Sequence, residues 1–547
     1  MNSIVELVVV LGGTIGLSVP FGLYIARMIS YEMRPLEAPL ARIENGFYKI
    51  IGIDKDKQMT WKEYSLALML TNVIVGAFVY FMLLYQNFLP QNFIPSSTHV
   101  NGLSIDLAFM QAISFTTNTD IQHYAGEQSF SLISQTAVLT FVMFVAPASG
   151  IAAAFAFIRG FIRKNFGLGN FYVDFIRIIL TLLLPVAFGS ALLLMVLGVP
   201  QTLNSSITIN HTLEGHNQTF TTGPVASLES IKELGSNGGG YYDANSGHPF
   251  ENPNGLTNMY EMFLMLIIPL SFPIAYAKLV GKARGVSLLL AILIGFGILL
   301  GISFSQVSGP TGLETRFGSF GTEFFNSASI STNTGSANSA LSGMSPNPVI
   351  SFLLAMFVQS IPGADGTGII YTIIYVIITL FIVGLMVGKT PEFMNMKISP
   401  RDVKLAAFIF LIHPATILIP TVIAFTTGNA QSVLAVPAGK MTTASGFTQA
   451  LYEYSSAAAN NGSDYLGTSA NIPFWNWSTA IVMFIGRYAP IVMSLAIAGS
   501  FTVKDRKEAI EPIKTYGPIF ISVLLVMTFL LTALTFFPVI VIGPFSM

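Results

Sequence analysis

Long apolar stretches alternate with shorter polar segments along almost the whole chain. A helix needs about 20 apolar residues to cross a bilayer, and ten stretches approach or exceed that length. They lie near residues 5–25, 65–85, 132–158, 174–197, 260–277, 286–304, 349–386, 405–426, 477–498 and 519–542. No basic residue precedes the first stretch, which contains Glu6, so we interpret it as a retained helix and not as a signal peptide. The pattern predicts an all-α polytopic membrane protein.

The seventh stretch is too long for a single span and contains the sequence PGADGTG at residues 362–368. Irregular backbone at membrane depth is tolerated only where it is buried in protein or faces a water-filled cavity. We interpret this stretch as one discontinuous helix whose break is a candidate gate, with Gly363, Gly366 and Gly368 as its residues. The alternative is a pair of short re-entrant pieces.

The composition supports a membrane protein and excludes several functions. Hydrophobic residues make up 52% of the 547 residues and charged residues only 10%, whereas soluble domains carry about 25% charged residues. The net charge of −1 gives no sign of a nucleic-acid partner. The chain has no cysteine, and its six histidines form no H-x-x-x-H pair. Disulfides, thiol catalysis and metalloenzyme spacing are therefore excluded.

Lysine and arginine are concentrated on one side of the predicted spans. Five segments hold 22 of the 26 basic residues, namely 26–62, 159–177, 278–284, 389–404 and 504–514. The opposite segments hold Lys232, Arg316 and Lys440. The positive-inside rule places the first set in the cytoplasm, so both termini are expected outside. The remaining basic residue, Arg487, falls in the middle of a span.

Four outer segments share one pattern, in which a short mixed segment is followed by polar residues and glycine and then by a long apolar stretch. They read MQAISFTTNTD, SLESIKELGSNGGG, EFFNSASISTNTGS and ALYEYSSAAANNGSD. We align them on an asparagine, and the aligned asparagines are separated by 119, 96 and 127 residues. Each interval contains two spans. The sequence therefore predicts a fourfold repeat of span, pore half-helix, filter loop and span around a pseudo-fourfold axis, with one extra helix at each end.

This repeat divides the chain into six parts. Residues 1–62 form the N-terminal helix and a cytoplasmic loop, and residues 506–547 form the C-terminal helix. The four pore repeats between them occupy residues 63–164, 165–282, 283–397, which includes the broken helix, and 398–505.

Four equivalent loops around one axis are suited to binding a dehydrated cation. A ring of peptide carbonyls replaces the hydration shell of the ion without adding charge. Glycine allows the backbone to adopt positive φ, and the negative ends of the half-helices favour a cation. One such loop would be an ordinary turn, but four in register with the spans favour a filter. The predicted filter residues are Thr117, Asn118, Thr119, Ser236, Asn237, Gly238, Gly239, Thr332, Asn333, Thr334, Gly335, Asn460, Asn461 and Gly462.

The chain also resembles a known family over nearly its whole length. The matching stretches are TNTDIQHYAGE at 117–127, GPVASLESIKELGSNGGGYYDANSGHPFENP at 223–253, ETRFG at 314–318, GLMVGKTPEF at 384–393, SSAAANNGSDYLGTSANIPFWN at 455–476 and MFIGRY at 483–488. They are similar to the potassium-binding A subunits of the Kdp potassium-transporting ATPases, whose superfamily is built from four channel-like repeats.

The resemblance implies a function, a ligand and partners. The filter would bind potassium ions, and the complex would import them across the cell membrane from dilute medium. A P-type ATPase subunit (KdpB) would supply the energy from ATP, and the small KdpC and KdpF-like subunits would assist assembly.

Several residues next to the filter have two interpretations. The related transporters carry an arginine at the place of Arg487, so we interpret it as a positive barrier below the filter, and the alternative is a structural ion pair. Asp120 and the polar third loop depart from the family pattern, which leads us to expect Asn or another neutral residue in place of Asp120. A further group attracts cations to the outer mouth, or only caps and cross-links the loops; it comprises Asp120, Gln122, Glu127 and Asp243.

The chain carries no complete nucleotide motif. The sequence GLMVGKT at 384–390 has three residues between its first glycine and Gly-Lys-Thr, whereas a phosphate-binding loop needs four. The Asp-Lys-Thr-Gly motif of P-type pumps does not occur, so we expect no ATP hydrolysis by this chain. Two function classes stay open: the potassium-selecting subunit of an ATP-driven complex, and a stand-alone channel or ion-coupled potassium transporter. A membrane enzyme ranks third.

Overall fold

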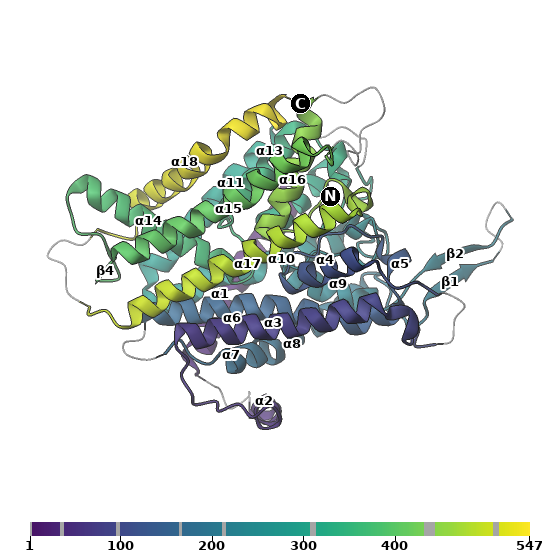
Figure 1. Cartoon of the computed structure of the whole chain (residues 1–547), viewed down its shortest axis with the longest axis horizontal. Coiled ribbons are helices and arrows are strands. Elements are labelled where there is room, and N and C mark those ends of the chain that lie inside the picture. The colour runs from purple at the N-terminus through teal and green to yellow at the C-terminus, as the bar shows by residue number, and fades with distance from the viewer. Residues whose placement is uncertain are drawn as a thin grey trace.

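The protein is an elongated helical bundle in which most long helices run along one axis (Figure 1). The computed structural model describes residues 3–32, 38–94, 99–162, 167–210, 215–306, 313–430, 443–506 and 513–546. Lys440, which contributed to the predicted orientation, lies outside the described residues.

Within the described residues, ten helical segments are long and apolar enough to cross a membrane. Each coincides with one of the ten predicted stretches, which confirms the all-α polytopic class. They are α1 (Ser3–Ser30), α3 (Trp61–Leu84), α6 (Thr140–Ile162) with the π turn before it, α7 (Phe171–Arg177) with α8 (Leu184–Val196), α10 (Gly255–Val280), α11 (Lys282–Phe304), α14 (Thr367–Val387), α15 (Pro400–Thr426), α17 (Pro473–Thr502) and α18 (Pro518–Ile542).

Four shorter helices each lead into one of the polar loops. They are α4 (Ile105–Thr116), α9 (Val225–Leu234), α12 (Gly318–Ser331) and α16 (Thr443–Ala459). A spanning helix precedes each short helix, and α1 and α18 lie outside this pattern. The predicted order of span, half-helix, loop and span therefore occurs four times in the structure.

The third repeat contains the predicted break. Helix α13 (Pro346–Val358) ends where Gln359 adopts a φ of 55°, and α14 begins at Thr367. The irregular segment thus starts before the predicted 362–368. Since α14 alone is long enough to span, the alternative of two short re-entrant pieces is wrong for α14.

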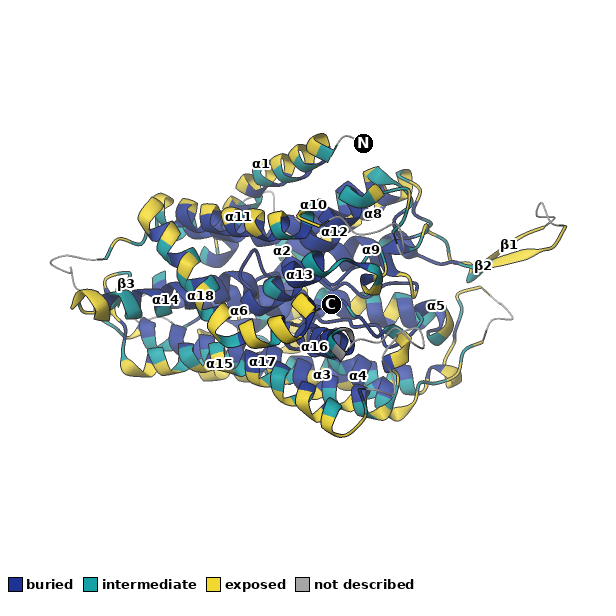
Figure 2. Cartoon of the chain, turned by 90° about the horizontal axis from the view of Figure 1, so that it is seen from above, coloured by how far each residue is buried: buried dark blue, intermediate teal, exposed yellow. Residues whose placement is uncertain are grey.

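Burial separates central helices from peripheral ones. The span that contains α6 is buried over 89% of its most apolar 18 residues, against 22% for α1 and 28% for α18. Exposed residues lie along the outer faces of the peripheral helices (Figure 2). They include large apolar residues such as Ile74 and Phe78 on α3. This distribution is expected of a bundle surrounded by lipid.

Two small hairpins mark opposite ends of the bundle (Figure 1). Strands β1 (Ser206–Ile209) and β2 (Gln218–Thr221) come from a predicted outer segment, and β3 (Glu392–Phe393) and β4 (Met396–Lys397) come from a predicted inner one. The start of α1 and the end of α18 lie toward the β1–β2 end (Figure 1). Two minor helices, α2 (Ala38–Ile51) and α5 (Gly126–Ser129), complete the described α-helices.

Candidate cation-binding site

The four polar loops have the same backbone geometry, which defines four loop positions. The first position lies at the end of the short helix, and the second adopts a φ between 50° and 61° in every loop. The amide at the third position donates to the carbonyl five residues earlier over 2.8–2.9 Å. In loop order, positions one to four are Thr117-Asn118-Thr119-Asp120, Gly235-Ser236-Asn237-Gly238, Thr332-Asn333-Thr334-Gly335 and Ala459-Asn460-Asn461-Gly462.

This geometry corrects the predicted alignment in the second loop. Asn237 occupies the third position, and Ser236 with a φ of 50° is the equivalent of Asn118, Asn333 and Asn460. Asparagine is enriched at positive φ, which made it the natural residue to align. Helix α9 ends at Leu234 with Gly235 as its C-cap, so the loop begins one residue earlier than the asparagine suggests.

The fourth positions bring the loops together in a closed ring. Gly238, Gly335 and Gly462 have φ values of 90°, 88° and 95°. A Cβ on each would lie within 2.0 Å of the third-position carbonyl oxygen of the next loop, on Thr334, Asn461 and Thr119 respectively. Loop 2 therefore contacts loop 3, loop 3 contacts loop 4, and loop 4 contacts loop 1.

Asp120 and Gly239 close the ring between loops 1 and 2. A Cβ on Gly239 would lie 2.8 Å from the Cβ of Asp120, so no side chain fits there. Gly239, unlike Gly238, does not have a positive φ. Close approach of another loop is the reason for glycine at position 239.

The third-position carbonyls are candidates to bind a cation. The four residues that carry them are fully buried, and none of these carbonyls accepts a hydrogen bond from the described residues. The carbonyl oxygens of Thr119 and Asn237 both lie within 3.6 Å of the point where a Cβ of Gly462 would stand. Buried carbonyls without a donor are rare in proteins, so converging unpaired carbonyls indicate a missing partner such as a cation.

Threonine hydroxyls pair within loops 1 and 3, and an asparagine side chain links loop 4 to loop 1. The hydroxyls of Thr117 and Thr119 are 2.8 Å apart, and those of Thr332 and Thr334 are also 2.8 Å apart. Asn460 Nδ2 donates to Thr119 Oγ1 at 3.0 Å. The unusually polar third loop therefore repeats the hydroxyl pair of the first loop.

A cavity of about 550 Å³ lies next to the ring. Gly335 and Gly462 line it together with Gln122 and Asp243, which are two of the four predicted mouth residues. Gln122 Oε1 also accepts hydrogen bonds from Gly240 N–H and Asn245 Nδ2 at 3.0 and 2.6 Å. Gln122 therefore both lines the mouth and cross-links the loops.

The other two predicted mouth residues lie elsewhere. Glu127 Oε2 accepts a hydrogen bond from the amide of Asp243 at 2.9 Å, and burial raises the pKa of both carboxyls. Asp120 lies in the ring and is fully buried.

Arg487 and the helix break meet near loop 4. Arg487 is 5% exposed and donates from Nη2 to the carbonyl of Ala146 at 3.3 Å. It lines a cavity of about 10 Å³ with Asn460 and Thr367, a volume that holds about one water molecule. Among the described residues no carboxylate forms a salt bridge with Arg487, so the ion-pair alternative has no partner there.

Gly150 on α6 connects Arg487 to the break. A Cβ on Gly366 would lie 2.4 Å from the carbonyl oxygen of Gly150, and a Cβ on Gly150 would lie 2.7 Å from Arg487 Nη2. Gly363 and Gly366 have φ values of 77° and 76°, and a Cβ on Gly368 would meet the carbonyl oxygen of Pro362 at 2.5 Å. Gly366 therefore packs tightly against α6, whereas Gly363 and Gly368 pack against each other within the break.

Lys232 was not among the predicted site residues. Its charge placed it with the basic residues of the outer side, whereas its side chain is fully buried on α9. The sequence did offer one signal of a special position: Lys232 lies three residues before the first position of its loop. The other three repeats carry Ser114, Ser329 and Ser456 there.

The closed ring of loops within ten spans defines a multi-pass membrane protein of the four-repeat, channel-like class. The family described as "Potassium-transporting ATPase A subunit" matches residues 8–546. The chain belongs to this family. A curated relative, the potassium-transporting ATPase potassium-binding subunit of Caldanaerobacter subterraneus subsp. tengcongensis, is 39% identical over all of this chain and 99% of its own length.

A solved structure shares the fold. The crystal structure of the potassium transporter TrkH from Vibrio parahaemolyticus aligns with a TM-score of 0.55, over 89% of this chain and 99% of that one. Its sequence identity is 14%, so this likeness concerns the fold alone.

Proposed function

We propose that this chain is the potassium-selecting subunit of an ATP-driven import complex in the cell membrane. K⁺ enters from the outer cavity, loses its water in the ring of loops and is passed to a P-type ATPase subunit of the KdpB kind. The family and the curated relative support potassium as the transported ion and an ATPase as the source of energy. KdpC and KdpF-like subunits are the further partners, and both termini lie outside.

The observation that carries this proposal is the set of four buried, unpaired carbonyls at the third loop positions. Carbonyl dipoles attract a cation without carrying a full charge. They therefore suit a monovalent cation that must be bound and then released from the site. The outer cavity contributes acidic groups, among them Asp243, Glu314 and Asp464, which raise the local cation concentration. The residues of the ring fit a potassium ion as cargo.

Ion competition on the purified, size-verified complex tests the proposal. We expect binding of K⁺ to be displaced far less readily by Na⁺ than by K⁺ itself. Binding without preference for K⁺ would overturn the assignment of the ring as a potassium filter. A stand-alone channel or ion-coupled transporter is the second candidate, since the shared fold with TrkH does not distinguish it.

The chain alone is expected neither to hydrolyse ATP nor to concentrate potassium. It carries only the incomplete phosphate-loop sequence at 384–390 and lacks the phosphorylation motif. The measurement is potassium-stimulated phosphate release from purified chain in liposomes, with the complete complex as the positive control. Turnover by a preparation shown to contain no partner subunit would refute this prediction and favour the second candidate.

A Gly366→Ala/Gly368→Ala double variant is expected to lower transport at least about tenfold while outer-site binding is retained. A side chain at positive φ costs about 1–2 kcal/mol, and both methyl groups would displace backbone atoms at 2.4–2.5 Å. Transport by the complex and K⁺ binding should be measured on the same preparations. Gly297→Ala is the control, because nothing lies within 4 Å of its Cβ position. Equal losses of binding and transport would instead indicate misfolding or a direct effect on the ring.

A further inference from the structure

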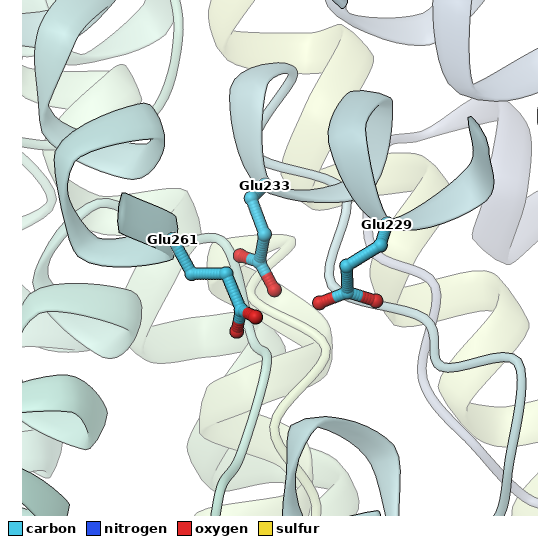
Figure 3. Close-up of side chains that lie close together, drawn as sticks. All are labelled: Glu229, Glu233 and Glu261. Atoms are coloured by element: carbon cyan, nitrogen blue, oxygen red, sulfur yellow. The ribbon is translucent and has the colours of Figure 1, made fainter. Parts of the chain in front are cut away.

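A buried ionic cluster lies directly behind loop 2. Lys232 Nζ is 2.6 Å from Glu251 Oε2, 2.9 Å from Glu229 Oε2 and 3.3 Å from Glu233 Oε1. All four side chains are fully buried. Glu261 from α10 faces the same cluster, and Figure 3 shows its carboxyl group next to those of Glu233 and Glu229.

The cluster is better described by its ammonium group than as a metal site. Single oxygens of Glu229, Glu233 and Glu261 lie within 4.8 Å of one another, which is a spacing that a metal ion tolerates. The ammonium of Lys232 already contacts two of these carboxylates. A second positive charge beside it would be strongly repelled in a buried setting, so Lys232 serves as the cation of this cluster.

The cluster is bonded to the ring through loop 2. Lys232 Nζ donates to Asn245 Oδ1 at 3.0 Å, and Asn245 Nδ2 donates to the carbonyl of Gly238 at 2.6 Å. The carbonyl of Lys232 itself accepts the amide of Asn237 at 2.9 Å. Both ends of the lysine therefore constrain the third and fourth positions of loop 2.

The cluster is also bonded to loop 3. Ser336, which follows Gly335, donates from its hydroxyl to Glu233 Oε1 at 2.6 Å. Ser336 and Glu233 are fully buried, and a hydrogen bond to a charged group is stronger than one between neutral groups. One ionic cluster thus holds two neighbouring loops of the ring at once.

The other repeats use serine at the place of Lys232. Ser114 Oγ accepts the amide of Ile121 at 2.9 Å, and Ser456 Oγ accepts the amide of Gly462 at 3.0 Å. Each serine supports its own loop by one neutral hydrogen bond. Ser329, in repeat 3, has no hydrogen-bond partner for its hydroxyl among the described residues. Loop 3 instead receives its support from Glu233, which belongs to repeat 2.

We propose that Lys232 is a positioning residue for ion selection, which acts through Asn245 on Gly238 and through Glu233 and Ser336 on loop 3. It does not contact the ion. It fixes the spacing of the carbonyls in half of the ring, and selectivity depends on that spacing. The inference rests on the proposed function, because it assumes that the ring discriminates among cations.

The test compares Lys232→Met, Ser336→Ala and the control Ser329→Ala in the purified complex. The readout is the ratio of apparent affinities for K⁺, Rb⁺ and NH₄⁺, measured together with assembly and thermal unfolding. Lys232→Met is expected to lower the preference for K⁺ about tenfold, and Ser336→Ala about threefold, because the second variant removes only the hydrogen bond that joins the cluster to loop 3. Ser329→Ala is expected to leave the ratio unchanged.

The outcomes separate the inference from the proposed function. A parent complex that shows no preference for K⁺ refutes the proposed function. A selective parent whose Lys232→Met and Ser336→Ala variants keep the parental ratio overturns the positioning role. Loss of stability with an unchanged ratio also overturns it, because a merely structural residue behaves in this way. If Lys232→Met does not assemble, Ser336→Ala and Asn245→Ala decide the question, since neither leaves a buried charge without a partner.

Discussion

Replacing Gly238 by serine is expected to lower the apparent affinity for K⁺ at least about tenfold and to admit Rb⁺ and NH₄⁺ more readily. Two effects act together at this residue. Its φ of 90° is costly for any side chain, by about 1–2 kcal/mol, and its Cβ would lie 1.8 Å from the carbonyl oxygen of Thr334. Loop 2 or loop 3 must therefore move, and that carbonyl is one of the four proposed ion ligands.

The measurement is ion competition on size-verified complexes, and the chain offers a matched control. Gly467 also has a positive φ, of 53°, and lines the outer cavity, but no atom lies closer than 4.0 Å to its Cβ position. Gly467→Ser therefore introduces backbone strain without a collision in the ring. Parental affinity and discrimination in the Gly238→Ser variant would mean that loop 2 is only a turn.

Because the loops form a closed ring, we expect the loss of K⁺ affinity and discrimination to occur on substitution in the other loops as well. Gly335 and Gly462 have the same conformation and the same contact with a neighbouring carbonyl, so serine at either place should produce a similar loss. Substitutions of Asn118, Asn333 and Asn460 should give related but smaller changes, because these residues hold the loops by side-chain hydrogen bonds.

The sequence was sufficient to predict the spans, the four half-helices and the position of the loops. These features depend on local composition: a span needs a long apolar stretch, and a loop at membrane depth stands out because it is polar and rich in glycine. The break before Thr367 was visible for the same reason, since Pro362 and three nearby glycines interrupt an apolar run.

The register and the electrostatics of the site were not predictable in this way. The equivalence of Ser236 with three asparagines depends on where α9 ends, and a shift of that end by one residue leaves the composition unchanged. The packing of Asp120 against Gly239 and the burial of Lys232 depend on contacts between distant segments. Pattern reasoning assigns a charged residue to the surface by default, which is why Lys232 was counted as an outer-side residue.

Replacing Arg487 by alanine is expected to increase passive K⁺ flux through the complex about thirtyfold. Two unit charges separated by about 8 Å interact by about 2 kcal/mol at an effective dielectric constant of about 20, which corresponds to that factor in rate. Arg487 lines a cavity of about 10 Å³ with Asn460 of loop 4 and with Thr367 of the break. We therefore expect its side chain both to repel a cation there and to fill the space that the cation would need.

The measurement is Rb⁺ uptake into K⁺-loaded liposomes without ATP, with Arg487→Lys and Arg487→Gln as companions. Lysine keeps the charge, and glutamine keeps much of the volume without it, so the two variants separate repulsion from occlusion. If the charge is the barrier, Arg487→Lys retains low flux and Arg487→Gln leaks nearly as much as Arg487→Ala. If the volume of the side chain is the barrier, the Arg487→Lys and Arg487→Gln variants keep a low flux and only Arg487→Ala shows an increased flux. Flux and assembly equal to the parent in Arg487→Ala would contradict either form of barrier, and the hydrogen bond to the carbonyl of Ala146 would then be the whole role of this residue.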